Sequence, residues 1–184
     1  MVKVATVVLV SLLAVVFGTA AQNGQPNAGQ PEKESKVEKY VRVTIAPVVY
    51  NRQAGDYVPT TQFKVGSLMR VAIHMTNTSK EPLTVGRFGP FVHERLRLLK
   101  DGKPVNYLHD VPKKIKTSDE NENVFVSPRE AVLEPNRESG YDQIDLSEWY
   151  GQLQPGHYEL TLRHRFGWRG KLVESNTVTF DVVQ

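Results

Sequence analysis

The residues best suited to binding a metal ion lie in one polar stretch, SDENENVFVSPRE. Asp119, Asn121 and Asn123 alternate along it, and Glu130 follows at the twelfth position. Oxygen ligands at the first, third, fifth and twelfth positions are the spacing of an EF-hand calcium loop. Val124, however, stands where that loop needs glycine for its sharp turn, and no helical pattern flanks the stretch. The stretch is a candidate calcium site, and the alternative is a solvated polar loop that leads into a strand.

A second candidate site is a hairpin tip within RHRFGWRGK. Gly167 and Gly170 bracket Trp168 and Arg169, and Phe166 precedes them. Tryptophan and arginine are common anchors at protein interfaces, so an exposed tip of this kind would bind a partner. The alternative is that Trp168 folds back over the open end of the domain. We take Phe166, Trp168 and Arg169 as candidate binding residues.

The sequence shows no recognisable catalytic pattern. It has no cysteine, which excludes a thiol nucleophile and thiolate metal ligands. Its five histidines are scattered, and no serine lies in a Gly-x-Ser-x-Gly turn. We therefore expect no enzymatic activity and no cofactor. The formal charge of +3, from 23 basic and 20 acidic residues, is too balanced to predict a nucleic-acid partner.

Alternating apolar and polar residues predict the elements that must position these sites. Val41, Val43 and Ile45 alternate with polar residues, which is the period of a half-buried strand, and Asp101-Gly102 marks a hairpin turn. No segment of ordinary helix length has helical periodicity. Strands are expected at residues 40–50, 67–79, 95–108 (a hairpin), 123–127, 141–146, 156–166 and 176–183. The fold class predicted is all-β, an antiparallel immunoglobulin-like β-sandwich.

The stretch DLSEWYGQLQPGHYEL predicts a corner that holds two strands together. An acidic pair three residues apart, Asp145 and Glu148, resembles a capping box for a single helical turn, which Gly151 would end. A Pro-Gly turn follows, and a tyrosine just inside the next strand can bond its hydroxyl to that turn, as in a tyrosine corner. The residues assigned to this corner are Asp145, Trp149, Pro155, Gly156 and Tyr158.

The sequence resembles three known families in parts. LQPGHYELTL and NTVTFDVV look like the last two strands of immunoglobulin-like modules in secreted bacterial proteins. IDLSEWYGQLQPGHYELTL is similar to part of the β-rich domain that precedes the catalytic domain in deuterolysin-like metallopeptidases. That family's catalytic His-Glu-x-x-His is matched neither by HERLR at His93 nor by HYELTLRH at His157, so the resemblance implies no catalytic residue. VAIHMTNTSKEPLTV resembles the opening of a BsuPI-type proteinase inhibitor domain.

The first residues predict export. Lys3 precedes a mostly apolar run from Val4 to Gly18, and small residues follow, so residues 1–21 are expected to be a signal peptide cleaved after Ala20 or Ala21. The run is shorter than the roughly twenty residues of a membrane span, although an uncleaved anchor is the alternative. Residues 22–38 are rich in Gln, Asn, Gly, Pro and charge, which predicts a disordered linker before a sandwich over 39–184. The expected location is secreted or periplasmic.

Three functional hypotheses follow from these patterns. The first is an exported, non-catalytic interaction module that binds another envelope or extracellular protein and has no membrane span after signal cleavage. The second is a secreted proteinase inhibitor that presents a protruding loop, either RFGPF at residues 87–91 or RFGWRG at residues 165–170. The third is a protein that resembles an accessory domain and assists an envelope enzyme.

Overall fold

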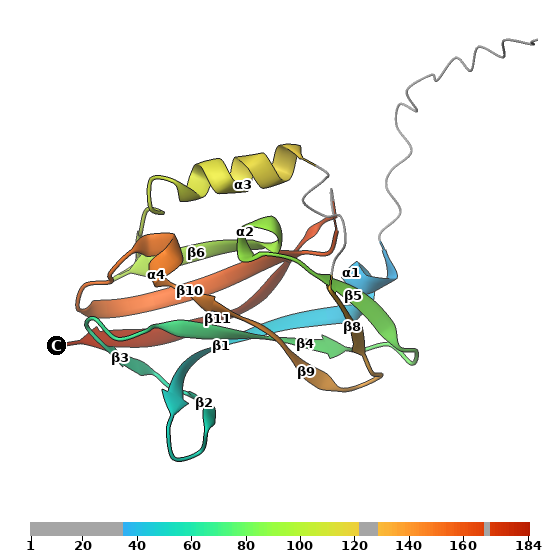
Figure 1. Cartoon of the computed structure of the whole chain (residues 1–184), viewed down its shortest axis with the longest axis horizontal. Coiled ribbons are helices and arrows are strands. Elements are labelled where there is room, and N and C mark those ends of the chain that lie inside the picture. The colour runs from blue at the N-terminus through green and yellow to red at the C-terminus, as the bar shows by residue number, and fades with distance from the viewer. Residues whose placement is uncertain (1–34, 122–128, 168–169) are drawn as a thin grey trace, which may run out of the picture. The chain divides into compact units, whose positions relative to one another are not determined.

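Two β-sheets face each other in the computed structural model, which describes residues 35–121, 129–167 and 170–184 (Figure 1). The first sheet has four strands in the order β2 (Asp56–Pro59), β1 (Val41–Asn51), β4 (Arg70–Asn77) and β9 (Glu138–Asp145). The second has five, in the order β3 (Gln62–Lys64), β11 (Leu172–Val183), β10 (Gly156–Arg165), β6 (Glu94–Lys100) and β7 (Lys103–Pro104). All neighbouring strands in these sheets are antiparallel except β3 and β11. The predicted all-β sandwich is confirmed.

Smaller elements complete the described part of the chain. A separate two-stranded sheet pairs β5 (Leu83–Arg87) with β8 (Arg129–Leu133). The helices are α1 (Lys36–Tyr40), α2 (Pro90–His93), α3 (Val111–Glu120) and α4 (Ser147–Tyr150). No helix among the described residues is long and apolar enough to span a membrane.

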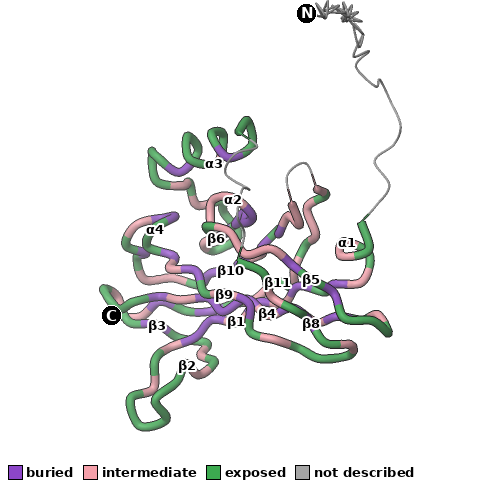
Figure 2. The backbone as a smooth tube through the Cα atoms, turned by 45° about the vertical axis from the view of Figure 1, so that its right-hand side comes forward, coloured by how far each residue is buried: buried purple, intermediate pink, exposed green. Residues whose placement is uncertain are grey.

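The core lies between the two sheets because each long strand alternates apolar and polar residues. In the first sheet Ile45 is the partner of Ile73, and in the second Leu160 is the partner of Leu98; all four are buried. Figure 2 shows the buried segments (purple) along the inner strands of both sheets. The strands predicted at 40–50, 67–79, 95–108, 156–166 and 176–183 are confirmed in type, the strand predicted at 141–146 overlaps β9, and 123–127 lies outside the described residues.

One side of the sandwich is joined by a side chain rather than by a backbone ladder. Asn176 of β11 accepts a hydrogen bond from the Ile45 N–H (2.8 Å) and donates one to the Ile45 carbonyl (3.1 Å). Its amide therefore satisfies the outward-facing peptide groups of β1 as a neighbouring strand would. Pro47 lies two residues further along the same edge of β1, where its missing N–H removes no bond to β4.

The predicted corner is present, with one correction. The Tyr158 hydroxyl donates to the Gln154 carbonyl (2.6 Å), and Trp149 is fully buried beside it in α4. Gly151 ends the turn with a φ of 71°. The predicted capping box is wrong. The N-cap residue of α4 is Leu146, one residue after Asp145, and the Asp145 carboxylate accepts from the backbone N–H and the hydroxyl of Ser147 instead.

Helix α3 contradicts the expectation that no helix of ordinary length occurs. Its ten residues place Val111, Ile115 and Ser118 toward the five-stranded sheet, and only the first two are apolar. Two apolar residues are too few to give a recognisable helical periodicity in the sequence. The Asp119 carboxylate adds a polar attachment, because it accepts a hydrogen bond from Arg95 of β6 and forms an ion pair with Arg165 of β10.

Candidate functional site

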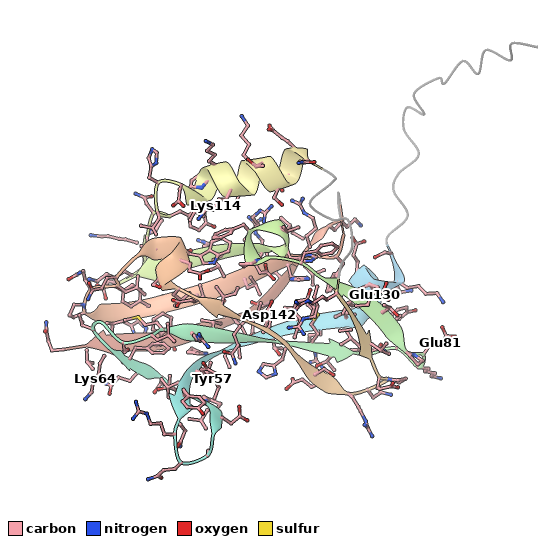
Figure 3. All side chains as sticks on the ribbon, viewed as in Figure 1. Tyr57, Lys64, Glu81, Lys114, Glu130 and Asp142 are labelled. Carbon is pink, nitrogen blue, oxygen red and sulfur yellow. The ribbon has the colours of Figure 1, made fainter. Side chains whose placement is uncertain are left out.

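A groove of about 790 Å³ lies on the outer face of the four-stranded sheet. Its floor consists of Ala46, Ala72 and Gly140, which lie on the neighbouring strands β1, β4 and β9. Small residues at these positions leave room for a ligand against the sheet. Tyr57 on β2 and Asp142 on β9 both line the groove and are labelled in Figure 3.

Two arginines are held within this groove by tyrosine rings. The guanidinium of Arg70 lies 5.2 Å from the centre of the Tyr57 ring, donates to the Tyr57 hydroxyl and reaches the Gln143 side chain at 3.3 Å. The guanidinium of Arg87 lies 5.3 Å from the centre of the Tyr141 ring and 3.8 Å from the Asp142 carboxylate. Both cations are thus already neutralised or stacked, which fixes their positions.

The groove carries an excess of negative charge. Four carboxylates line it against the two guanidinium groups, namely Asp56, Asp142, Asp145 and Glu148. Asp142 is the only one of the four in an ion pair among the described residues. A groove with unpaired carboxylates attracts a cationic ligand and repels an anionic one.

Strand β9 forms one edge of the sheet beside the groove. The Leu146 N–H donates to the Met69 carbonyl (2.9 Å), and the Asn77 N–H donates to the Arg137 carbonyl (3.4 Å). Bonded and non-bonded positions alternate along an antiparallel pair. The peptide groups that face away from β4 are therefore those of Glu138, Gly140, Gln143 and Asp145. Of these, the Gln143 N–H already donates to the Asp142 carboxylate (2.8 Å). Such an edge is a template for an added strand.

A buried polar cluster lies between the sheets at the end of β6 and β10. Glu94 and His164 are directly opposed, with 3.4 Å between the carboxylate oxygen and Nδ1, and both are essentially inaccessible. His93 stacks on His164 with ring centres 4.7 Å apart, and its Nδ1 bonds the Arg165 carbonyl. Burial raises the pKa of Glu94 well above its ordinary value and lowers the pKa of both histidines, that of His93 to about 4. Burial thus favours the neutral form of both partners of the opposed pair.

The described residues of the predicted calcium loop lie on different elements. Asp119 lies in the last turn of α3 and is bonded to two arginines, Asn121 follows that helix, and Glu130 lies on β8. Asn123 lies outside the described residues. Within the described ranges, no group of three or more histidine or acidic side chains is arranged to hold a metal ion.

The predicted hairpin anchors are only partly described. Phe166 is half-buried and packs edge-on against His164, with ring centres 4.6 Å apart. Trp168 and Arg169 lie outside the described residues. Of the other proposed inhibitor loop, Phe91 lies in α2 and stacks on Trp149 at 4.7 Å rather than protruding.

Sequence reasoning did not find the groove on the four-stranded sheet. Its lining comes from strands that are far apart in the chain, and small residues such as Ala46, Ala72 and Gly140 give no chemical signal. The polar residues that alternate with the core residues of β4, such as His74, indicate an outer face, which is compatible with either a solvated surface or a binding surface.

Comparison with known proteins adds information about the fold alone. No protein-family pattern and no curated protein sequence matches the chain. The chain is similar to the CARDB domain of a Pyrococcus furiosus protein, whose crystal structure was determined in complex with di-metal ions. The identity is 11%, the TM-score is 0.35, and the match covers 78% of this chain and 92% of that chain. Its solution structure gives 11% identity, a TM-score of 0.33 and coverage of 78% and 94%. These comparisons do not support the resemblances to deuterolysin-associated or BsuPI-type domains.

Proposed function

We propose that this protein is an exported, non-catalytic binding module that binds an extended basic segment of another envelope or extracellular protein. The single observation that carries the proposal is the acidic groove that borders the open edge of β9. An extended segment added beside β9 would bond its outward peptide groups. Lysine or arginine side chains on that segment would then meet the carboxylates of Asp56, Asp145 and Glu148.

The alternatives have less support from the described residues. An inhibitor needs a loop that protrudes into a protease cleft, whereas Phe91 and Phe166 pack onto the molecule. The most unusual titratable groups, Glu94 and His164, are inaccessible to a substrate. The groove, in contrast, is open to solvent and large enough for several side chains.

A test is selection of a displayed library of random peptides against the full chain, followed by affinity measurement of the enriched peptides by fluorescence anisotropy. We expect enrichment of sequences with lysine or arginine at alternate positions. Gly140→Phe should weaken their binding by about tenfold or more, because the ring fills the groove. A Cβ at Gly140 meets no atom within 4 Å and the residue has no positive φ, so the variant should fold.

The matched control is Thr179→Phe, which adds the same ring to an exposed position of β11 on the other sheet. It should bind the selected peptides as the wild type does. Enrichment without basic residues would contradict the charge argument, and equal loss of affinity in both variants would contradict the location of the site.

A further inference from the structure

A second groove, of about 520 Å³, lies between α3 and the outer face of the five-stranded sheet. Figure 1 shows α3 over β6 and β10, on the other side of the sandwich from β1, β4 and β9. The groove is therefore independent of the peptide groove. Its lining combines three cations, two carboxylates and three apolar or aromatic residues: Arg95, Lys116, Arg163, Asp119, Glu120, Tyr107, Pro112 and Ile115.

Like charges face each other across the floor of this groove. Arg95 of β6 and Arg163 of β10 are direct cross-strand partners. Two like charges in this position destabilise a sheet unless an anion compensates them. Asp119 is that anion for Arg95, and the same carboxylate oxygen lies 2.9 Å from Nη1 of Arg165. One carboxylate thus serves two guanidinium groups. The third, that of Arg163, has Glu174 of β11 as its other cross-strand partner and forms no ion pair with it.

The two facing arginines differ in what they can still bind. The Arg95 side chain is only 9% exposed, and its donors are used by Asp119 and by the carbonyls of Glu94 (2.7 Å) and Phe91 (3.1 Å). Arg163 is exposed and forms no ion pair in the described part of the chain. Arg95 therefore contributes a fixed positive field, whereas Arg163 has a guanidinium available to an external anion.

The remaining walls favour a ligand with an apolar body. Tyr107 is half-buried, and its hydroxyl is turned inward because it donates to the Leu96 carbonyl. Pro112 and Ile115 of α3 lie across the groove from the sheet. Lys116 and Glu120 are 3.8 Å apart at the exposed rim, where an ion pair contributes little and leaves the ammonium group able to exchange partners.

We propose that this groove binds a small amphiphilic carboxylate. The acid group forms the two-pronged hydrogen bonds of a guanidinium–carboxylate pair with Arg163, within the field of Arg95. The apolar body lies against Tyr107 and Ile115, where it is removed from water. The site would give the module a second ligand of opposite charge to the peptide and on the opposite face.

The probe for the experiment is 3-phenylpropionate, titrated into the full chain while backbone amide shifts are followed by NMR. We expect saturable shifts in α3 and around Arg163. Acetate lacks the apolar body and 3-phenylpropan-1-ol lacks the charge, so each should bind about tenfold more weakly or worse. Arg163→Gln should weaken binding of 3-phenylpropionate to a similar degree because it removes the bidentate cation.

Arg97→Gln is the matched control. Arg97 is an exposed arginine on the same face of β6, two residues from Arg95, and it does not line the groove. This variant should bind 3-phenylpropionate as the wild type does. Equal binding of the alcohol and the acid, equal loss in both arginine variants, or shifts confined to β4 and β9 would each overturn the proposal.

Discussion

Tyr158 is a buried side chain whose one polar atom has one partner. It is 2% exposed, and its hydroxyl donates to the Gln154 carbonyl at 2.6 Å. Tyr158→Phe keeps the ring and removes the donor, so the Gln154 carbonyl loses its bond at the corner. We expect the free energy of unfolding in urea to fall by about 1 kcal/mol or more.

The control for this prediction is Tyr50→Phe. Tyr50 is 55% exposed, so its hydroxyl can bond water in the folded and unfolded states alike. Its removal should change the free energy of unfolding by less than about 0.5 kcal/mol. Equal effects of the two substitutions would mean that the corner hydrogen bond contributes no net stability.

At the scale of elements, Asn77 connects three segments that no continuous ladder joins. Its side chain is fully buried at the end of β4; it donates to the Glu81 carbonyl (2.7 Å) and the Leu133 carbonyl (2.9 Å) and accepts from the Ser79 N–H (2.8 Å). The amide therefore attaches β8 and the turn after β4 to the four-stranded sheet.

Substitution of Asn77 tests this attachment. Asn77→Ala removes the donor to the Leu133 carbonyl and the acceptor of the Ser79 N–H, while the Glu81 carbonyl keeps the Ser79 hydroxyl as a donor (2.8 Å). We expect a loss of about 2 to 4 kcal/mol in the free energy of unfolding. Asn77→Asp keeps the acceptor but directs a carboxylate at two carbonyls, so it should be no more stable than the alanine variant. An aspartate variant as stable as the wild type, measured by urea denaturation, would contradict the bonding described here.

Sequence patterns predicted the elements whose structure is decided locally. The alternation around Ile45 and Leu160, the Asp101-Gly102 turn (φ 50° and 75°) and the Tyr158 corner are each set by residues within one or two strands. Helix α3 was not predicted because it is attached to the sheet by Asp119 and two arginines rather than by an apolar stripe. The pairing of β5 with β8 was not predicted because the paired residues are more than forty positions apart in the sequence.

The two grooves could not be predicted for a related reason. Arg95 and Arg163 become neighbours only through the pairing of β6 with β10, and Ala46 meets Ala72 only through the pairing of β1 with β4. Along the chain each of these residues indicates nothing more than an outward-facing strand position. The register of the strands, rather than any local pattern, creates both candidate sites.

At the scale of the whole molecule, the sandwich has one end of its core filled with titratable groups. Glu94 and His164 face each other two residues along β6 and β10 from the Leu96–Leu162 pair, and His93 of α2 stacks on His164. Burial is the largest cause of each pKa change. Repulsion from Asp142 adds to the rise in the pKa of Glu94, while Arg95 and Arg165 add to the fall in that of His93.

These changes predict two opposite dependences of stability on pH. The lowered pKa values of His93 and His164 stabilise the fold above 6.5, and this contribution is lost as pH falls, for His93 toward about 4. The raised pKa of Glu94 acts oppositely: its contribution is complete below 4.5 and declines as pH rises. Between pH 4.5 and 6.5 the contributions of the two histidines to stability increase with pH, while that of Glu94 decreases. The net effect is that of one titrating group, so the free energy of unfolding should increase with pH by about 1.4 kcal/mol per unit or less.

Above pH 6.5 the histidine contributions are constant, so a further decrease in stability as pH rises comes from Glu94. Glu94→Gln tests the assignment because an amide fills the same space and carries no proton to lose. Urea denaturation from pH 4 to 9 should show that this variant has a steeper acid decline, because the opposing contribution is gone, and loses the alkaline decline. A variant with both limbs unchanged would mean that Glu94 is ionised in the native protein, and the stacked histidines would then face a buried negative charge rather than a neutral acid.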